Sequence, residues 1–270
     1  MPRYQEESFL GSGDLQLAVY KDGVLLGERD VGNASQFVIN PPTLEKKELI
    51  GMRRANYSQT IKSVITKTEQ ELKFTLTDIN RKNLALAMFG EDAVFTQAAG
   101  TATEESITAR LDAWSKLENR KIVDTAGSKP VVTNADASVT YVEDTHYLVD
   151  YQVGRIQALS GGTITEGQEL KVTYGYQAIE DGWKVASNKV SQFECFLRLI
   201  GRDQANNRDC EVVVYKAQIE PAGDINWLTE DFNTLEFNGT ILAMAGGTWD
   251  VFFYNIGTAE GLFTPPGGED

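Results

Sequence analysis

Residues 71–77 read ELKFTLT, and this stretch decides the fold class of the chain. Leu72, Phe74 and Leu76 alternate with polar or charged side chains. In an extended strand, neighbouring side chains point to opposite faces, so the alternation predicts one buried face and one face in solvent. The stretch is therefore interpreted as a half-buried β-strand, which we expect to pair with another strand at residues 60–68.

The same period of two recurs along the chain. Leu15, Leu17 and Val19 point one way, and a turn at residues 21–23 (Lys-Asp-Gly) leads into a returning strand at residues 24–26, which is the pattern of a hairpin. Further strands are expected at residues 147–153, 170–176, 192–200, 211–219 and 249–254. Many short strands separated by Gly, Asn and Asp predict a mostly β protein with a sandwich or barrel core.

One segment has helical character. Residues 77–90 open on a capping residue, are rich in Leu, Ala and Met, and close on Gly90. They predict a helix of roughly three turns over 78–89, packed on the sheet through Ile79 and Leu86. Periodicity alone does not decide between helix and strand for residues 104–114, because helical spacing fits the whole segment while strand alternation fits 106–111.

The expected organisation has five parts. An N-terminal arm covers 1–14, and the first part of the core covers 15–115. That part includes a long irregular loop at 40–59, which begins at Pro41-Pro42. A composition shift near 116–130 marks a smaller all-β inserted module at 116–181. The second part of the core covers 182–256, and a flexible tail covers 257–270.

Charge and composition exclude several partners. The 270 residues include 25 Lys and Arg against 39 Asp and Glu, a net charge of −14. Wrapping a nucleic acid or binding an anionic membrane surface requires excess positive charge. No apolar run approaches the ~18 residues of a membrane span, so we expect the reducing cytoplasm. There Cys195 and Cys210, which could bridge, are expected to be buried thiols.

Two motifs resemble parts of a phosphate-binding or catalytic site, but each lacks residues that such a site requires. Residues 11–14 (Gly-Ser-Gly-Asp) begin like a phosphate loop, without the third glycine and the Lys-Ser/Thr that follow in such loops. We interpret them as a flexible hinge. His146 lies near Asp144 and Asp150, yet no activated nucleophile accompanies it, so a partly exposed strand histidine is expected.

An oxygen-rich stretch could in principle bind calcium. This stretch lacks the glycine and the terminal glutamate of a calcium-binding loop, which favours a β-turn. Its members are Asn134, Asp136, Ser138 and Glu143. With one histidine in the chain, we expect no catalytic residues, metal ligands or cofactor, and no enzyme activity.

A basic cluster lies inside the expected 40–59 loop. Its members are Lys46, Lys47, Arg53 and Arg54. Such a cluster is either a solvated face or a contact with an acidic surface. In a chain of charge −14, the most available acidic surface is another copy of the same chain.

Several runs in order resemble a known family. Residues 131–134, 140–151, 154–156, 161–164 and 167–176 are similar to the β-module of tail tube (major tail) proteins of long-tailed bacteriophages. Residues 80–90, 196–201 and 219–242 resemble the helix, core strand and later core of that family, so the likeness covers most of 10–245. It departs at 144–146, where a Gly-Thr-Asp-like turn is expected. The resemblance favours a strand at 106–111.

The resemblance implies a structural virion protein. Six copies would form a ring, rings would stack, and inner strands would close one continuous β-barrel around a channel. Tape-measure protein fills such a channel, and DNA later passes through it without specific binding. Other implied partners are tail terminator and baseplate or tail-tip proteins, and a sheath in a contractile tail. The implied location is the virion tail, assembled in the host cytoplasm, with no membrane partner.

The resemblance also gives the basic cluster and the module their expected roles. A ring of six copies carries six times −14, or −84 formal charges, which favours passage of DNA but makes stacked rings repel. We expect Lys46, Lys47, Arg53 and Arg54 to offset this repulsion by contacting acidic residues of the adjacent ring. The 116–181 module is expected to face outward.

Two other classes stay open. A carbohydrate- or surface-binding β-sandwich would use exposed aromatic rings as stacking platforms. The candidates are Trp114, Trp183, Trp227 and Trp249. A capsid-cementing protein would form trimers. Size in solution separates these classes, because a binding module stays small while a tube protein forms rings or long polymers.

Overall fold

The computed structural model describes residues 9–254 and confirms a mostly β protein with one helix in that range. The chain divides into two compact units, the first made of residues up to 92 and from 185 onward, and the second of 93–184. No sheet closes into a barrel within the described part of a single copy.

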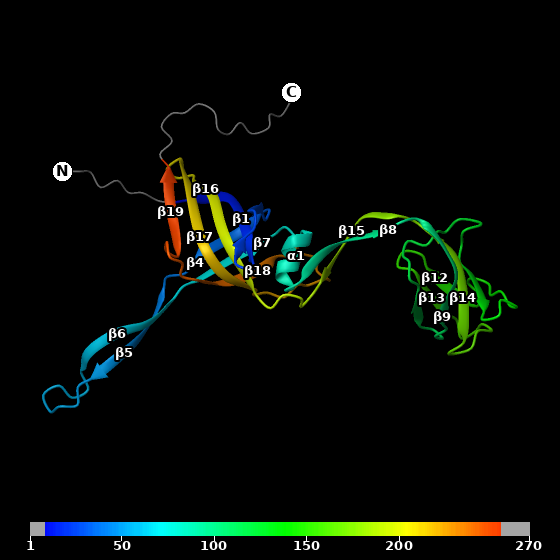
Figure 1. Ribbon diagram of the computed structural model, residues 1–270, viewed down its shortest axis with the longest axis horizontal. Helices are drawn as coiled ribbons and strands as arrows, with labels where there is room; N and C mark the ends of the chain where they lie inside the picture. Colours follow the sequence, from blue (N-terminus) through cyan, green and yellow to red (C-terminus); the bar gives the residue numbers. More distant parts are fainter. Residues whose placement is uncertain (1–8, 255–270) are drawn as a thin grey trace, which may run out of the picture. The chain divides into compact units, whose positions relative to one another are not determined.

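The first unit is built on a nine-stranded sheet in which every pair is antiparallel (Figure 1). Its order is β2-β1-β16-β17-β18-β7-β4, with β3 also on β1 and β19 also on β17. The strands are β1 (Gly11–Lys21), β2 (Val24–Leu25), β3 (Arg29–Asp30), β4 (Ala34–Ile39), β7 (Glu71–Leu76), β16 (Phe193–Asp203), β17 (Arg208–Pro221), β18 (Leu235–Ile241) and β19 (Trp249–Tyr254).

The alternating stretch 71–77 behaves as predicted. Leu72, Phe74 and Leu76 are fully buried in β7. The ring of Phe74 stacks on that of Phe237 in the neighbouring β18, with centroids 4.8 Å apart. The core of this unit therefore forms on one face of the sheet, and side chains on the other face of each strand point away from it.

The predicted partner of this strand is wrong. β7 pairs with β4 and β18, whereas residues 60–69 form β6 (Thr60–Glu69), which pairs with β5 (Thr43–Ile50). The expected irregular loop at 40–59 thus contains a hairpin strand at 43–50, and 40–42 and 51–59 lie outside strands. The strand predicted at 60–68 is therefore confirmed, and only its partner is wrong. The partner was missed because β5 has no buried face, so its sequence shows no apolar alternation to mark it as a strand.

The helix is shorter than predicted. α1 (Arg81–Ala87) begins after Asn80, whose Oδ1 accepts a hydrogen bond from the Asn83 backbone N–H at 2.9 Å. Leu86 packs into the core as predicted. Ile79 does not, since it precedes the cap and is 38% exposed. The left-handed residue at the helix end is Phe89 (φ 46°), so Gly90 does not provide that conformation.

The N-terminal hairpin is confirmed, and the hinge before it is wrong. Asp22 and Gly23 both have positive φ, as a two-residue turn between β1 and β2 requires. Residues 11–14 are strand, not hinge, because β1 already pairs with β16 from Gly11 onward. A Cβ on Gly13 would lie 2.5 Å from Gly201 Cα, so glycine there permits close strand approach. The expected flexible tail at 257–270 lies outside the described residues.

The second unit has its own hydrophobic core, with Ile156, Leu170 and Tyr174 almost fully buried. Its sheets have the orders β10-β13-β12 and β11-β14-β9. The strands are β9 (Gly100–Thr108), β10 (Trp114–Lys116), β11 (Val131–Asn134), β12 (Tyr147–Asp150), β13 (Arg155–Ala158) and β14 (Glu169–Tyr176). The strand alternative for 106–111 is confirmed up to residue 108.

The boundaries of this unit differ from those expected for the module. It begins at Ala93 and not at residue 116, because β9 pairs with β14 and supplies Ile107 to the second core. The chain enters and leaves it through β8 (Glu91–Gln97) and β15 (Ile179–Ala186), which form a separate two-stranded sheet.

The stacked pair of rings gives a direct test of this core. Replacing Phe74 by Ala removes a fully buried ring and its partner for Phe237, so we expect about 3–5 kcal/mol less free energy of unfolding. Denaturant unfolding measures it. The control is Phe252→Ala on the exposed face, which should cost less than about 1 kcal/mol. An equal loss of unfolding free energy in both variants would show that Phe74 is not part of the hydrophobic core.

Candidate assembly interface

The hairpin made of β5, β6 and the turn between them, residues 43–69, is here called the arm. Every residue of its two strands is exposed, and the strands pair only with each other. At its base, the Asn40 backbone N–H donates to Glu71 O at 2.8 Å, and Gln70 Nε2 donates to Asn40 O at 3.1 Å. The arm is therefore tied to the main sheet at its base, while its strands make no packing contact with the core.

The tip of the arm has a defined turn. Gly51 N–H donates to Gln59 O at 2.7 Å, and Ser58 N–H donates back to Gly51 O at 2.9 Å. The Asn56 side chain accepts from the Arg53 N–H at 3.2 Å. These bonds close the 51–59 segment, so Arg53 and Arg54 project from an ordered turn.

The structure gathers the four predicted basic residues on the arm but does not put them on one face. Lys46 lies opposite Ile65, and the next residue, Lys47, lies opposite Val64, so the two side chains point to opposite faces. Arg53 and Arg54 are at the tip. None of the four forms an ion pair with another described residue.

Sequence reasoning missed the apolar side chains of the arm. Eight large apolar residues are exposed on this one hairpin: Leu44, Leu49, Ile50, Met52, Tyr57, Ile61, Val64 and Ile65. The register places Ile65 on one face and Val64 on the other, so both faces of the hairpin expose apolar surface of the kind that marks interaction sites. The arm also carries six basic and three acidic side chains, a charge of +3 in a chain of −14. Its chemistry fits a partly apolar, acidic partner surface.

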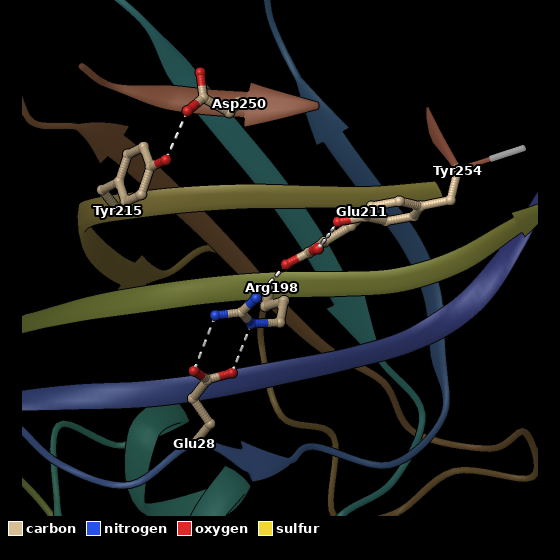
Figure 2. Close-up of polar contacts among 6 residues, drawn as sticks. All are labelled: Glu28, Arg198, Glu211, Tyr215, Asp250 and Tyr254. Atoms are coloured by element: carbon tan, nitrogen blue, oxygen red, sulfur yellow. Dashed lines mark hydrogen bonds and ion pairs between the residues drawn. The ribbon is translucent and has the colours of Figure 1, made fainter. Parts of the chain in front are cut away.

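A second candidate surface is the face of β1, β16, β17 and β19 that points away from the core. Figure 2 shows its polar network, which is centred on Arg198. The guanidinium donates to both oxygens of Glu28, at 2.8 and 3.2 Å, and also bonds Glu211. Tyr254 donates to Glu211 at 2.7 Å. Bonding to Glu28 raises the pKa of Arg198, and Glu211 adds to the effect.

The charge on this face is negative. Its register places Asp14, Asp209, Glu211 and Asp250 on the same side as two arginines. Arg198 is held by two carboxylates, and Arg202 lies opposite Asp209. The Tyr215 hydroxyl donates to Asp250 at 2.6 Å, which raises the pKa of that tyrosine. The face therefore has no cluster of unpaired positive charge that could bind a polyanion such as DNA.

The same four strands have open edges. β19 pairs only with β17, and residues 11–14 of β1 pair with β16 on one side and with no described strand on the other. Exposed edges of this kind invite pairing with another chain.

The residues flagged for catalysis do not assemble a site. His146 precedes β12, and its Nδ1 accepts a hydrogen bond from the Val142 backbone N–H at 2.9 Å. Asp150 instead binds Arg155, which lowers the pKa of that carboxyl. His146 is therefore engaged by the backbone of its own turn, and no carboxylate orients it.

The oxygen-rich stretch is a turn, as expected. Asp136 Oδ1 accepts from the Ser138 N–H at 3.1 Å, and Asn134 Oδ1 accepts from the Val139 N–H at 3.0 Å. Glu143 turns away to the hydroxyl of Tyr151. Over residues 9–254, no group of three or more His, Cys, Asp or Glu side chains is placed to hold a metal ion.

The tryptophans are not equivalent. Trp249 packs against the first core, and its Nε1 donates to Gln70 at 3.0 Å, so it is no exposed platform. Trp114 is exposed but carries the Arg155 guanidinium 5.2 Å from its ring centre. Trp183 and Trp227 are exposed.

The cysteines are free buried thiols, as predicted. Burial raises the pKa of Cys195 to about 12, so this thiol stays protonated and unreactive at neutral pH. No helix within residues 9–254 has the length and apolar character that a membrane crossing requires.

Comparison with protein families places the chain in one of them. A family described as "Protein of unknown function UCP028589" matches residues 8–246, which is most of the chain. The protein belongs to this family. The matched range spans both compact units and includes the arm. No curated protein matches the sequence significantly.

The network around Arg198 predicts a measurable coupling. Arg198→Met leaves Glu28 and Glu211 facing each other without a cation, so we expect about 1–2 kcal/mol less free energy of unfolding at neutral pH and low salt. Adding Glu211→Gln removes one of the two negative charges and should recover part of that loss. Strictly additive losses in denaturant unfolding would show that the three side chains are independent.

Proposed function

We propose that this protein is the subunit of a bacteriophage tail tube, a structural virion protein that forms hexameric rings which stack. The arm is the observation that carries the proposal. A hairpin with two wholly exposed strands, eight exposed apolar side chains and excess positive charge is suited to packing against another copy of an acidic chain. The family resemblance over residues 10–245 implies that the copy contacted by the arm lies in the adjacent ring.

The open edges support ring formation. Directions alternate in the order β1, β16, β17, β19, so the two edge strands run in opposite directions. Joining β19 of one copy to β1 of the next therefore gives an antiparallel pair and removes both open edges. Six copies joined in this way would close one continuous barrel, which residues 9–254 of a single copy do not form.

The charge distribution supports a conduit. The outward face of these strands is negative, and both of its arginines lie opposite or between carboxylates. A channel with such a lining would let tape-measure protein fill it and DNA pass without specific binding. Tail terminator and baseplate or tail-tip proteins would then meet the ends of the tube, and a sheath would surround it if the tail is contractile. The site of action would be the virion tail, assembled in the host cytoplasm.

The carbohydrate- or surface-binding alternative receives less support. Of the four tryptophans proposed as platforms, one packs against the core and another lies under an arginine. We propose a structural role without catalysis.

Size in solution tests the proposed function. Purified protein should form rings or long tubes by negative-stain electron microscopy, with particle masses near multiples of six subunits by light scattering. A stable monomer of 29.8 kDa at concentrations of about 1 mg/ml would contradict the proposal, and a trimer would favour the capsid-cementing class.

The role of the arm makes a second prediction. Arg53→Glu/Arg54→Glu turns the arm from +3 to −1 and should prevent ring stacking, because the arm would then be repelled by the acidic neighbour. Microscopy should show isolated rings or smaller particles. The matched control, Lys116→Glu/Lys184→Glu, reverses two exposed charges outside the arm and should leave tubes intact. Normal tubes in the arm variant would refute this role.

The second unit makes a third prediction. Gly182 and Phe95 lie side by side on the two-stranded β8–β15 sheet, so residues 96–181 can be replaced by an Asn-Gly turn that keeps this hairpin closed. Since the unit has its own core, tubes should still form and be thinner. Loss of tubes in a variant that remains folded by circular dichroism would make this unit part of the tube wall.

A further inference from the structure

The loop between β17 and β18, residues 222–234, exposes large apolar side chains to an unusual degree. Phe232 is 100% exposed, Leu228 is 92% exposed and Trp227 is 67% exposed. Single exposed apolar residues are ordinary, but three large ones on one short loop add up to a sizeable exposed apolar surface. Such exposure in a soluble protein indicates a surface that another molecule covers.

The loop is held in a defined shape. Ile225 packs against the first core, and the Ala222 N–H donates to Glu236 O at 2.9 Å. Asn233 Nδ2 donates across the loop to Asn226 O at 2.5 Å. The Leu228 N–H donates to Asn226 Oδ1 at 3.0 Å. The loop's own hydrogen bonds thus present the apolar side chains outward, so little ordering remains to be lost on binding.

The charge of this loop is the opposite of that of the arm. It contains Asp224, Glu230 and Asp231 and no Lys or Arg, a charge of −3 against +3 on the arm. The three carboxylates form no ion pair with other described residues. Arm and loop therefore combine exposed apolar side chains with complementary, unpaired charge.

We propose that the loop 222–234 of one copy is the surface on which the arm of an adjacent copy docks. This inference rests on the proposed function and names the acceptor of the arm within it. Both surfaces are exposed in a single copy, so the contact joins two copies. Apolar side chains of the arm cover Phe232 and Leu228, while Arg53 and Arg54 meet Glu230 and Asp231.

The outward face of β1, β16, β17 and β19 is also acidic, but its Glu211 and Asp250 already bond Arg198 and Tyr215. A further acidic surface is the two-stranded β8–β15 sheet. It carries Glu91, Asp92, Glu180 and Asp181, but Asp92 is already bound to Arg81 at 2.6 Å. Its exposed large apolar side chains are Val94 and Trp183. The loop offers more exposed apolar surface and no carboxylate that is already neutralised, so the observations favour the loop.

A charge swap tests the docking directly. The arm variant is Arg53→Glu/Arg54→Glu, and the loop variant is Glu230→Arg/Asp231→Arg. Each alone should raise the protein concentration needed for half-maximal tube formation at least about tenfold, measured by light scattering. The two combined in one chain should return it to within about threefold of the wild-type value, because the charge pairs are restored in reverse. As control, the arm variant combined with Glu180→Arg/Asp181→Arg should stay defective.

The apolar part of the contact has its own test. Phe232→Ser should also raise that concentration at least about tenfold, whereas Val94→Ser on the β8–β15 sheet should not change it. Phe232 is fully exposed in a single copy, so neither variant should lower the melting temperature of unassembled protein.

The outcomes separate the two proposals. If wild-type protein forms no rings or tubes, the proposed function fails. If wild-type tubes form but the combined swap remains defective, or the loop variants assemble normally, then the loop is not the acceptor and the proposed function stands. Rescue by the Glu180 and Asp181 reversal would instead assign the arm to the β8–β15 sheet and overturn the inference.

Discussion

A two-stranded hairpin that buries nothing is marginal in water, and the arm is such a hairpin. Its strands bond only to each other, and its side chains contribute nothing to the core to which its base is tied. Keeping eight apolar side chains in solvent has no advantage for a monomer. In the proposed assembly, another copy covers the arm, and the open edges and the exposed loop pair with neighbouring copies.

The parts of the fold that the sequence predicted are those in which burial imposes a period. In β7 and in the β1–β2 hairpin, one face packs on the core, so apolar residues must alternate, and the Asp22-Gly23 turn requires residues that tolerate positive φ. The arm strands have no buried face, so the strand at 60–68 could be predicted but its pairing with 43–50 could not. The start of the second unit was misplaced for a related reason. β9 alternates weakly because most of it is exposed, and only Ile107 of its described residues is buried, with Ala102 packed against the core.

The candidate interface could be predicted in charge but not in shape. Lys46, Lys47, Arg53 and Arg54 form an evident basic cluster in an acidic chain, and the structure places all four on one element. Lys46 and Lys47 point to opposite faces because they are neighbours in a strand. This could not be predicted because the segment was expected to be irregular. The bonds of Arg198 join residues 28, 198 and 211, and such distant positions are brought together only by the folded sheet and the connection between β2 and β3. In the acidic loop, the sequence suggested exposure of Trp227 but not of Leu228 or Phe232.

The two-stranded β8–β15 sheet connects the second unit to the first, here called the guest and the host, and lets each fold on its own core. Antiparallel neighbours leave and return at almost the same point, so the host requires only that a guest have closely spaced termini. A guest that meets this condition can be exchanged by recombination without disturbing the strand order on either side. In a repeating polymer, every subunit would then display its guest at a regular spacing, which makes this junction a natural point at which to attach a foreign enzyme or antigen.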